Sequence, residues 1–353
     1  MAVVGGAGFL GSHLVNYLVE DRGCDVLVID NLVAGRREFV NRKAEFVHAD
    51  ITESETYLHQ LFVKHGCRYV FNYAAYPYIP VSFVRPLHVF NVNASGALKV
   101  INAAQDAGCE GILQVSSAEI YGDGPLMEEE DRVLDRHPGK IGESAPVVPH
   151  SSYGAAKAAI DAMVQVRWRE AKTPCIALRQ FNCVGERETH PYVVPEIISQ
   201  LDRQRKFNVV KQNRQGEDAR GPECYDVPKS GTVLLGNNSF RDFLYAGDAV
   251  RIAVELLERG QFGEVYNLGS ETGIKMYDLA KLIGRLMGFA DVKVEEDPRR
   301  KRPWEIWHLQ SDNTKLRNVI ALPDEKWQAT PLDKALRRTI KWYESNERRW
   351  PWE

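Results

Sequence analysis

The sequence predicts an α/β fold, with a doubly wound parallel sheet and a smaller mixed α/β lobe toward the C-terminus. Short β-branched or aromatic runs alternate with amphipathic stretches through the first half of the chain, a glycine series follows the first run, and this regular alternation is lost after about residue 180. Alternating strands and helices favour a parallel sheet that helices cover on both faces. A chain of 353 residues is long enough to form a large core and a second lobe.

The elements of the first half follow one another in a regular order. The strand-like runs lie at residues 2–4, 25–30, 45–47, 69–73, 111–116 and 175–178. The amphipathic, helix-like stretches lie at residues 52–65, 94–107 and 155–170. The first run, the glycine series with the helix after it, and the second run give the order strand, helix, strand.

The second half of the chain has a different organisation. The sequence predicts a strand at residues 232–235 and helices at residues 194–205, 249–259, 276–287 and 331–346. Segments near residues 123–150 and 208–231 are irregular and rich in polar residues, glycine or proline, which indicates surface insertions. We therefore predict one domain over residues 1–180, to which residues 249–270 return, and a second lobe that takes up most of residues 181–353.

The composition is typical of a globular protein and argues against several kinds of partner. Hydrophobic residues make up 44% and charged residues 26%, and the formal net charge is -3, so the chain as a whole is not drawn to nucleic acid or to an anionic membrane. Six cysteines lie without a C-x-x-C pair or metal-like spacing, as in proteins of a reducing compartment. Residues 1–18 lack the basic start of a signal peptide. We expect a cytoplasmic protein with no metal site and no nucleic acid or membrane partner.

Three glycines directly after the first strand form the motif G-x-x-G-x-x-G. Gly5, Gly8 and Gly11 span the turn into the first helix, with Phe9 and Leu10 between the last two. Glycine permits a sharp turn and lets a pyrophosphate approach the backbone, while the helix N-terminus offers unpaired N–H groups and a positive dipole. The motif in this context predicts a Rossmann-type domain that binds a dinucleotide.

Acidic residues at two strand ends favour NAD as the cofactor. Asp30 ends the second strand about 20 residues after the glycines, where a carboxylate accepts hydrogen bonds from the adenosine ribose. A carboxylate there repels the 2′-phosphate of NADP, and Asn31, not an arginine, comes next. We expect Asp30 and Asn31 to bind the adenosine half of NAD. Asp50 and Ile51, after the third strand, are candidates for contacts with adenine, although Asp50 is equally typical of a cap.

A tyrosine and a lysine have the spacing of an acid–base pair on one face of a helix. Tyr153 and Lys157 form Y-x-x-x-K within a predicted helix, so both side chains lie on one face. A nearby ammonium lowers the pKa of a phenol and produces a tyrosinate, which is able to take a proton from a sugar hydroxyl as hydride leaves its carbon. Because this spacing is also common on solvated helix faces, its interpretation depends on the neighbouring strand.

That strand carries the residues by which the family is identified. Residues 116–122 read Ser-Ser-Ala-Glu-Ile-Tyr-Gly at the end of the fifth strand, where α/β sheets bind ligands. Together with the glycine motif, Asp30 and the Tyr153–Lys157 pair, this segment resembles the extended short-chain dehydrogenase/reductase family, specifically its NAD-dependent nucleotide-sugar epimerases and dehydratases. The resemblance continues at residues 93–96, 179–185, 241–243, 267–269 and 302–303.

The resemblance implies roles for further residues. Ser117 is similar to the hydroxyl that hydrogen-bonds the sugar oxygen, Tyr153 to the base, and Lys157 to the residue that holds tyrosine and the nicotinamide ribose. Substrate contacts of a nucleotide-diphosphate sugar are implied for Asn182, Arg241 and Arg302, since guanidinium groups suit phosphate. Cofactor contacts are implied for Ala74, Ala75 and Asn93, and a homodimer is implied through the helices near residues 94–107 and 155–170.

The reaction that the resemblance implies proceeds through a 4-keto sugar, with hydride passing from C4 to bound NAD and then returning. Return to C4 gives epimerisation, and transfer to C6 after loss of water gives 4,6-dehydration. Many of the dehydratases carry two acidic residues after the serine or threonine, whereas this chain has Ala118 followed by Glu119. Glu119 keeps C5 chemistry open, including decarboxylation of a uronic acid.

Other functions remain open from the sequence. An NAD(P)H-dependent keto-sugar reductase uses the same serine, tyrosine and lysine, and a non-catalytic dinucleotide-sensing module has usually lost the tyrosine or the lysine. The basic run at residues 299–302 has the composition of a nonspecific polyanion site, but four charges in a nearly neutral protein argue against nucleic acid.

Overall fold

The computed structural model describes residues 1–123, 139–213, 231–321 and 329–346, with side chains described at 1–123, 139–205, 231–321 and 329–346. Its main feature is a seven-stranded sheet in the order β10-β6-β5-β4-β1-β2-β3, in which every pairing is parallel. The strands are β1 (Ala2–Val4), β2 (Leu27–Asp30), β3 (Glu45–His48), β4 (Tyr69–Asn72), β5 (Gly111–Ser117), β6 (Cys175–Gln180) and β10 (Val265–Leu268). The predicted parallel sheet is confirmed.

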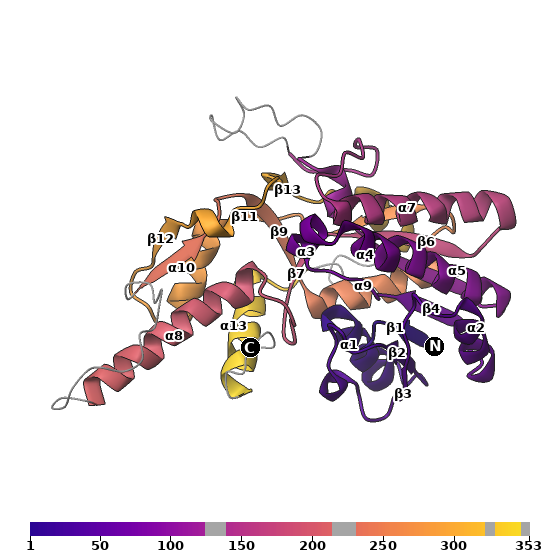
Figure 1. Ribbon diagram of the computed structural model, residues 1–353, viewed down its shortest axis with the longest axis horizontal. Helices are drawn as coiled ribbons and strands as arrows, with labels where there is room; N and C mark the ends of the chain where they lie inside the picture. Colours follow the sequence, from indigo (N-terminus) through magenta and orange to yellow (C-terminus); the bar gives the residue numbers. More distant parts are fainter. Residues whose placement is uncertain (124–138, 214–230, 322–328, 347–353) are drawn as a thin grey trace.

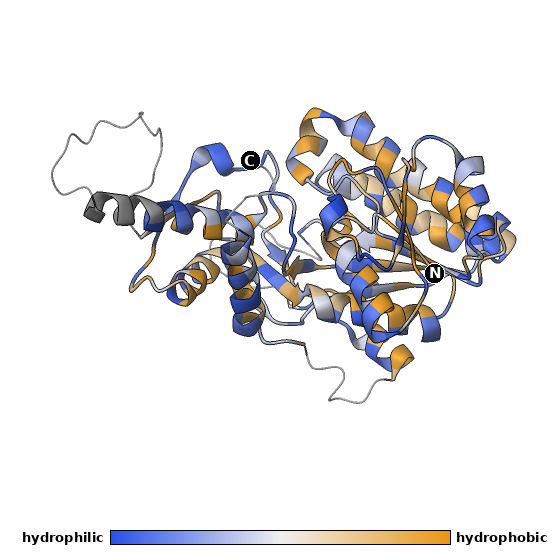
Figure 2. Ribbon diagram, turned by 90° about the horizontal axis from the view of Figure 1, so that it is seen from below, coloured by the Kyte–Doolittle hydropathy of each residue, from blue (hydrophilic) through white to orange (hydrophobic). Residues whose placement is uncertain are grey.

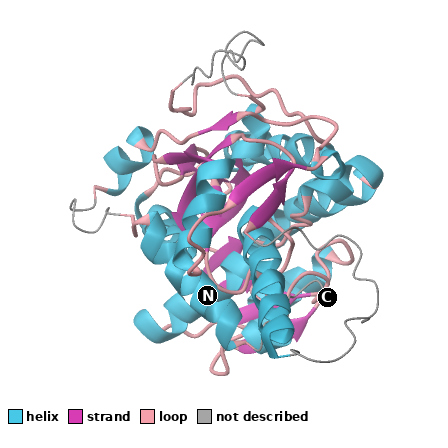
Figure 3. Cartoon of the chain, turned by 90° about the vertical axis from the view of Figure 1, so that its left-hand side faces the viewer, coloured by secondary structure: helices cyan, strands magenta, loops and turns pink. Residues whose placement is uncertain are grey.

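Helices cover both faces of this sheet (Figure 1). One face packs against α1 (Phe9–Asn16), α9 (Ala246–Arg259) and α11 (Thr314–Ile320). The other face packs against α2 (Glu55–Lys64), α5 (Ala97–Asp106) and α7 (Ser152–Ala171). Successive residues of a strand point to opposite faces, so Val3 joins the first core and Val4 the second. The result is the doubly wound arrangement, seen in Figure 3 as strands between layers of helices.

A second lobe is built on smaller sheets. Its hydrophobic core contains residues of the helices α8 (Val193–Asn213), α10 (Met276–Leu286) and α13 (Leu332–Ser345). One sheet runs β11 (Gly273–Lys275), β9 (Phe240–Tyr245) and β13 (His308–Leu309), and β7 (Asn182–Val184) pairs with β9. The other pairs β8 (Thr232–Leu235) with β12 (Lys293–Glu296). Figure 2 shows that helices of both lobes carry hydrophilic and hydrophobic stretches, as amphipathic packing requires.

Most predicted strands and helices begin and end within a few residues of those in the structure, but some elements of the structure were not predicted. Helix α8 continues to Asn213, into the stretch expected to be irregular from residue 208. Two short helices, α3 (Ile79–Val84) and α4 (Pro86–Phe90), and a π-helical turn at Asn91–Gly96 before α5 had no clear periodic signal. Of the two predicted insertions, residues 124–138 and 214–230 lie outside the described residues. Strand β10, within the predicted return segment 249–270, lies beside β6 in the large sheet.

The predicted site motifs lie at one edge of the large sheet. The carboxyl ends of β1, β2, β4, β5 and β6 face the same edge of the sheet because all pairings are parallel, and the predicted motifs follow these ends.

Within the described ranges, no helix combines the length and apolar character that crossing a membrane requires.

Candidate active site

A cavity of about 880 Å³ lies along the carboxyl edge of the large sheet and extends to the second lobe. The predicted site residues that line it are Gly5, Gly8, Phe9, Leu10, Gly11, Asp30, Asn31, Asp50, Ile51, Ala74, Ala75, Ser117, Glu119, Tyr153, Lys157, Asn182, Arg241 and Arg302. Asn93 is the only predicted site residue missing from the wall. The fold therefore brings together side chains that the sequence spreads over about three hundred residues.

The glycine loop is packed so closely that side chains would not fit. Gly5 has a φ of +80°, and a Cβ there would lie 2.5 Å from the backbone nitrogen of Ala74. A Cβ on Gly11 would lie 2.1 Å from the carbonyl oxygen of Gly5. Helix α1 begins at Phe9, and its N-cap Gly8 has no side chain to cap the first N–H groups, which are left for a ligand. These features fit the pyrophosphate of a dinucleotide.

Asp30 lines the cavity and also holds the glycine loop. Its carboxylate accepts hydrogen bonds from the backbone N–H of Ala7 at 2.9 Å and of Leu32 at 2.8 Å. Burial raises the pKa of Asp30, and the two backbone hydrogen bonds oppose that rise. A Cβ on Gly35 would lie 2.9 Å from one of the carboxylate oxygens, so this turn approaches Asp30 closely.

Asp50 lines the cavity and holds the loop after β3, whereas the cap of the following helix α2 is Ser54. Its carboxylate accepts hydrogen bonds from the backbone N–H and the hydroxyl of Thr52, both at 2.7 Å. It also accepts one from the side-chain amide of Asn31 at 2.8 Å. The structure thus links two of the residues predicted to bind the adenosine half of NAD. The side chain of the adjacent Ile51 packs closely against Gly96, where a Cβ would lie 2.9 Å from it.

Asn93 has a different place from the one that the sequence predicts. Its side chain is fully buried and lies outside the cavity wall. The side-chain oxygen accepts a hydrogen bond from the backbone N–H of Tyr76 at 2.6 Å, and the side-chain nitrogen donates to the carbonyl of Tyr76 at 3.1 Å. Asn93 therefore positions the loop that carries Ala74, Ala75 and Tyr78, and its described contacts make it a support for the site.

Ser117, Tyr153 and Lys157 lie together in the cavity wall. Ser117 ends β5, while Tyr153 and Lys157 lie one turn apart on α7. Ser117 lies close enough to Tyr153 to lower the pKa of its phenol, and the Ser117 hydroxyl accepts a hydrogen bond from the backbone N–H of Glu119 at 3.2 Å. The Lys157 ammonium donates to the carbonyl of Val115 at 2.9 Å and lies 5.9 Å from the centre of the Tyr153 ring. Helix α7 is capped by Ser151, whose hydroxyl accepts a hydrogen bond from the N–H of Gly154 at 3.0 Å.

The electrostatics of this group differ from the tyrosinate that the sequence suggests. Burial raises the pKa of Tyr153, and the nearby hydroxyl of Ser117 lowers it by less. Burial also lowers the pKa of Lys157 to about 8, so this side chain is still largely charged at pH 7. The protein alone therefore favours the neutral phenol. Lys157 is the nearby positive charge that would stabilise a tyrosinate during proton transfer.

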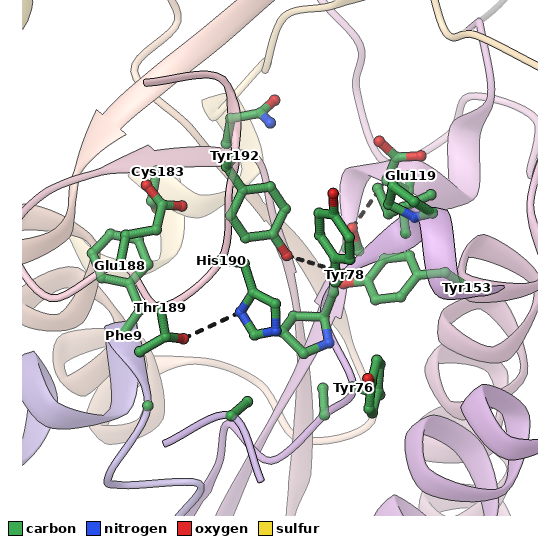
Figure 4. A pocket seen from close by; sticks show the side chains of 18 of the residues that line it. Phe9, Tyr76, Tyr78, Glu119, Tyr153, Cys183, Glu188, Thr189, His190 and Tyr192 are labelled. Carbon is green, nitrogen blue, oxygen red and sulfur yellow. Dashed lines mark hydrogen bonds between the residues drawn. The ribbon is translucent and has the colours of Figure 1, made fainter. Parts of the chain in front are cut away.

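Glu119 faces the same space from the short helix after β5 (Figure 4). Burial raises the pKa of Glu119, while the positive charges of Arg302 and Arg241 lower it. The neighbouring Ala118 is buried at 2% exposure and carries no acid. One carboxyl group, and not two, therefore follows Ser117 in the wall.

The predicted phosphate-binding arginines share one carboxylate. Arg241 donates to Glu305 at 3.1 Å and to the carbonyl of Phe240 at 3.0 Å, and is nearly buried. Arg302 lies 3.9 Å from the same carboxylate and is more exposed. Arg302 is therefore freer to meet a diphosphate than Arg241, which is already held by the protein. Asn182, on β7, lines the cavity as expected.

The basic run at residues 299–302 is neutralised locally. The pairs are Arg299 with Asp297 at 3.0 Å, Arg300 with Glu196 at 2.7 Å, Lys301 with Glu296 at 2.8 Å, and Arg302 with Glu305 at 3.9 Å. Four neighbouring carboxylates leave no concentrated positive charge for a polyanion.

The sequence missed an aromatic group that bridges the two lobes. Tyr78 stacks on His190 with ring centres 5.6 Å apart, and Tyr192 donates a hydrogen bond to the carbonyl of Pro77 at 2.6 Å. Figure 4 shows these rings between Tyr153 and the wall that holds Glu188. No motif marks these residues, because their contacts join segments more than a hundred residues apart; only the run Thr-His-Pro-Tyr at residues 189–192 was available as a signal.

Comparisons with known proteins agree with this geometry. A model of the NAD dependent epimerase/dehydratase family matches residues 1–269. A dTDP-D-glucose 4,6-dehydratase of Mus musculus is 29% identical over 99% of this chain and 89% of its own length. A UDP-glucose 4-epimerase of Lacticaseibacillus casei is 27% identical over 98% of this chain and 97% of its own. The crystal structure of a UDP-glucose 4-epimerase with UDP-glucose from Thermotoga maritima has a TM-score of 0.79 and 25% identity, covering 98% of this chain and 99% of that one.

Proposed function

The chain belongs to the NAD-dependent epimerase/dehydratase family, and we propose that it converts a nucleotide-diphosphate sugar through a 4-keto sugar without net oxidation or reduction. The main support for this proposal is that Ser117, Tyr153 and Lys157 line the same cavity as the glycine loop and Asp30. Such a cavity suits an alcohol beside a dinucleotide. Its length along both lobes suits a substrate with a nucleotide at one end and a sugar at the other.

The residues of this chain fit NAD. The glycine loop would hold the pyrophosphate, Asp30 would accept hydrogen bonds from the adenosine ribose, and Lys157 would hold the nicotinamide ribose. When bound, NAD supplies the group that accepts hydride from the sugar and gives it back. The carboxylate of Asp30 supports NAD over NADP, because a 2′-phosphate would meet a negative charge.

The protein's own part in the reaction is proton transfer and alignment. Tyr153 takes the proton of the C4 hydroxyl, and the hydroxyl of Ser117 donates a hydrogen bond to the same sugar oxygen. Lys157 offsets the negative charge that develops on Tyr153, since it lies on the same helix face. We assign Asn182 and Arg302 to the diphosphate, and Arg241 to positioning Glu305 beside Arg302.

Of the two fates of a 4-keto sugar, the side chains support epimerisation at C4 more fully. Ala118 stands where dehydratases of this family often have an acid, and it cannot protonate a leaving hydroxyl. Epimerisation needs no further acid or base. The buried carboxyl of Glu119 supports a second candidate, a lyase that removes water or carbon dioxide, because it faces the same space as Tyr153.

Mass spectrometry of the products separates these outcomes. The protein is incubated, without added reductant, with UDP-, GDP-, dTDP- and CDP-linked hexoses and uronic acids. We expect a product of unchanged mass and altered chromatographic retention, formed by the Glu119→Gln variant at a rate within about tenfold of the wild type. Loss of water or carbon dioxide that depends on Glu119 would assign the lyase. Turnover only after NADH or NADPH is supplied would contradict the redox-neutral proposal and favour a reductase.

Assembly and location complete the proposal. We assign a homodimer to the face formed by α3, α4 and α7, since Val84 and Leu87 are about four-fifths exposed and Phe90 lies beside them. This face includes α7, which covers one of the two helices predicted to form a dimer. Sedimentation compares the oligomeric state of the wild type with that of Leu87→Glu, which should disrupt the dimer. A cytoplasmic location is supported by the five described cysteines, which are all free thiols.

A further inference from the structure

Glu188 is a buried acidic residue to which neither sequence motifs nor the proposed reaction gives a role. It lies between β7 and α8, lines the cavity and is 5% exposed. Its backbone carbonyl accepts a hydrogen bond from the hydroxyl of Tyr343 at 3.1 Å, which fixes this turn of the chain. Among the described residues, none makes a hydrogen bond or ion pair with its carboxyl group. An acidic side chain that is largely buried, lines a cavity and has no described partner in the protein points to a ligand in that cavity.

The neighbouring charged residues show that this lack of a partner is particular to Glu188. Glu186 accepts hydrogen bonds from the hydroxyl of Tyr245 at 3.1 and 3.3 Å, and it lies 3.8 Å from Arg338. Arg187 points the other way and donates to the carbonyl of Ser12 at 3.3 Å. Burial raises the pKa of Glu188 well above its ordinary value, so the neutral carboxyl group is favoured. A neutral carboxyl group both accepts and donates hydrogen bonds, as a primary amide does.

The position of Glu188 identifies the part of the cavity that it serves. In Figure 4 it lies with Cys183 and Phe9 on one side, and Tyr153 and Glu119 lie on the other. Phe9 is the first residue of α1, where the pyrophosphate fits. A hydride acceptor must come within about 3.5 Å of the carbon whose hydroxyl meets Tyr153. The nicotinamide end of the cofactor would therefore reach from the N-terminus of α1 toward Tyr153, within the cavity whose wall includes Glu188.

We propose that the carboxyl group of Glu188 binds the carboxamide of nicotinamide and thereby sets the orientation of the reactive ring. The complementary groups are the amide N–H, which donates to the carboxyl oxygen, and the amide oxygen, which is able to accept the carboxyl proton. This inference rests on NAD as the cofactor but not on the identity of the sugar reaction. It concerns binding, so it is tested without a nucleotide-sugar.

The test compares NAD with 3-acetylpyridine adenine dinucleotide, in which a methyl group replaces the amide nitrogen. The protein as purified is incubated to equilibrium with both dinucleotides, and the amounts retained after gel filtration are measured by mass spectrometry. The variants are Glu188→Met, which has similar length and no oxygen acceptor, and Glu188→Gln, which keeps an acceptor and a donor. Glu186→Gln is the matched control, because it removes a nearby carboxylate that lies outside the cavity wall.

We expect the wild type to prefer NAD by about tenfold, as loss of one buried hydrogen bond predicts. The preference should persist in Glu188→Gln and Glu186→Gln and should fall to within about twofold in Glu188→Met. A Glu188→Met variant that keeps the full preference would overturn the proposal. So would a wild type that binds both dinucleotides equally, a result that needs no variant to fold. Absence of sugar turnover would leave this outcome unaffected and would count only against the proposed reaction.

Discussion

The hydroxyl of Ser117 and the phenol of Tyr153 lie close together across the boundary between strand β5 and helix α7, near enough for Ser117 to lower the pKa of Tyr153. The strand end fixes the serine, and the capped first turn of the helix fixes the tyrosine. Two groups able to bind one sugar oxygen are therefore in place within the fold of the protein itself. This relationship gives the first of the mutational expectations.

Replacing Tyr153 by Phe removes the group that exchanges a proton with the sugar and changes little of the packing. We expect turnover to fall by roughly 10² to 10⁴, the usual contribution of a general base. The affinity for NAD should change by less than about threefold, since the phenyl ring remains. Steady-state rates and calorimetric NAD titrations check the two expectations. Turnover within tenfold of the wild type would remove Tyr153 from the mechanism.

Lys157 should make the folded protein more costly to form at neutral pH than at high pH, because its ammonium group is buried. Because burial lowers its pKa from 10.5 to about 8, the unfolded chain binds more protons at this site between those values. The contribution of Lys157 to the free energy of unfolding therefore rises with pH in this range, because the buried ammonium group loses its charge. The stability advantage of Lys157→Met over the wild type should shrink by roughly 2 to 3 kcal/mol between pH 7 and pH 10.

Urea unfolding at several pH values measures that difference. Comparing the two proteins at each pH cancels the titration of all other groups and the constant loss of the bond to Val115. A difference that does not change with pH would mean that Lys157 is not buried as an ammonium group.

Asp30 should determine the choice between NAD and NADP. In Asp30→Asn the negative charge is gone, so repulsion of a 2′-phosphate is reduced and the hydrogen bonds to the adenosine ribose are weakened. We expect the ratio of the NADP and NAD dissociation constants to fall by about tenfold or more. Because the carboxylate also holds Ala7 and Leu32, a small drop in melting temperature should accompany the change. An unchanged ratio would contradict the placement of the adenosine ribose.

Arg302 should act on the substrate and not on the cofactor. It is less buried than Arg241 and only loosely paired with Glu305, which leaves its guanidinium for a phosphate. We expect Arg302→Gln to raise KM for the nucleotide-sugar by about tenfold, with kcat and NAD affinity nearly unchanged. Lys43→Gln serves as the exposed control. Weaker NAD binding with an unchanged KM would place this arginine at the cofactor instead.

The sequence predicted the large sheet well because its signals are local. The strand runs, the glycine series and the Tyr153–Lys157 spacing each lie within a few residues, and the parallel order of the strands follows from their alternation with helices. The same locality explains why Ser117 and Glu119 were expected in the wall. Helix α8 was underestimated because its last turns are polar and resemble a loop in composition.

What the sequence could not provide depends on contacts between distant segments. Tyr78 and His190 meet only because the loop after β4 packs against the segment after β7, and Glu188 in that segment is buried. For Asn93, the family motif suggested a contact with the cofactor. In the structure its side chain accepts a hydrogen bond from the backbone N–H of Tyr76 instead. The sequence also suggested a lowered pKa for Tyr153, whereas burial raises it more strongly than the nearby Ser117 hydroxyl lowers it.

The central claim is that hydride leaves C4 of the sugar and returns to the same molecule. The most direct measurement uses a nucleotide-hexose with deuterium at C4, incubated with the protein without free NADH, and locates the deuterium by mass spectrometry and NMR. Our account predicts that the product sugar retains the deuterium, at C4 after epimerisation. Deuterium found in the solvent, or accumulating in free dinucleotide, would contradict the account.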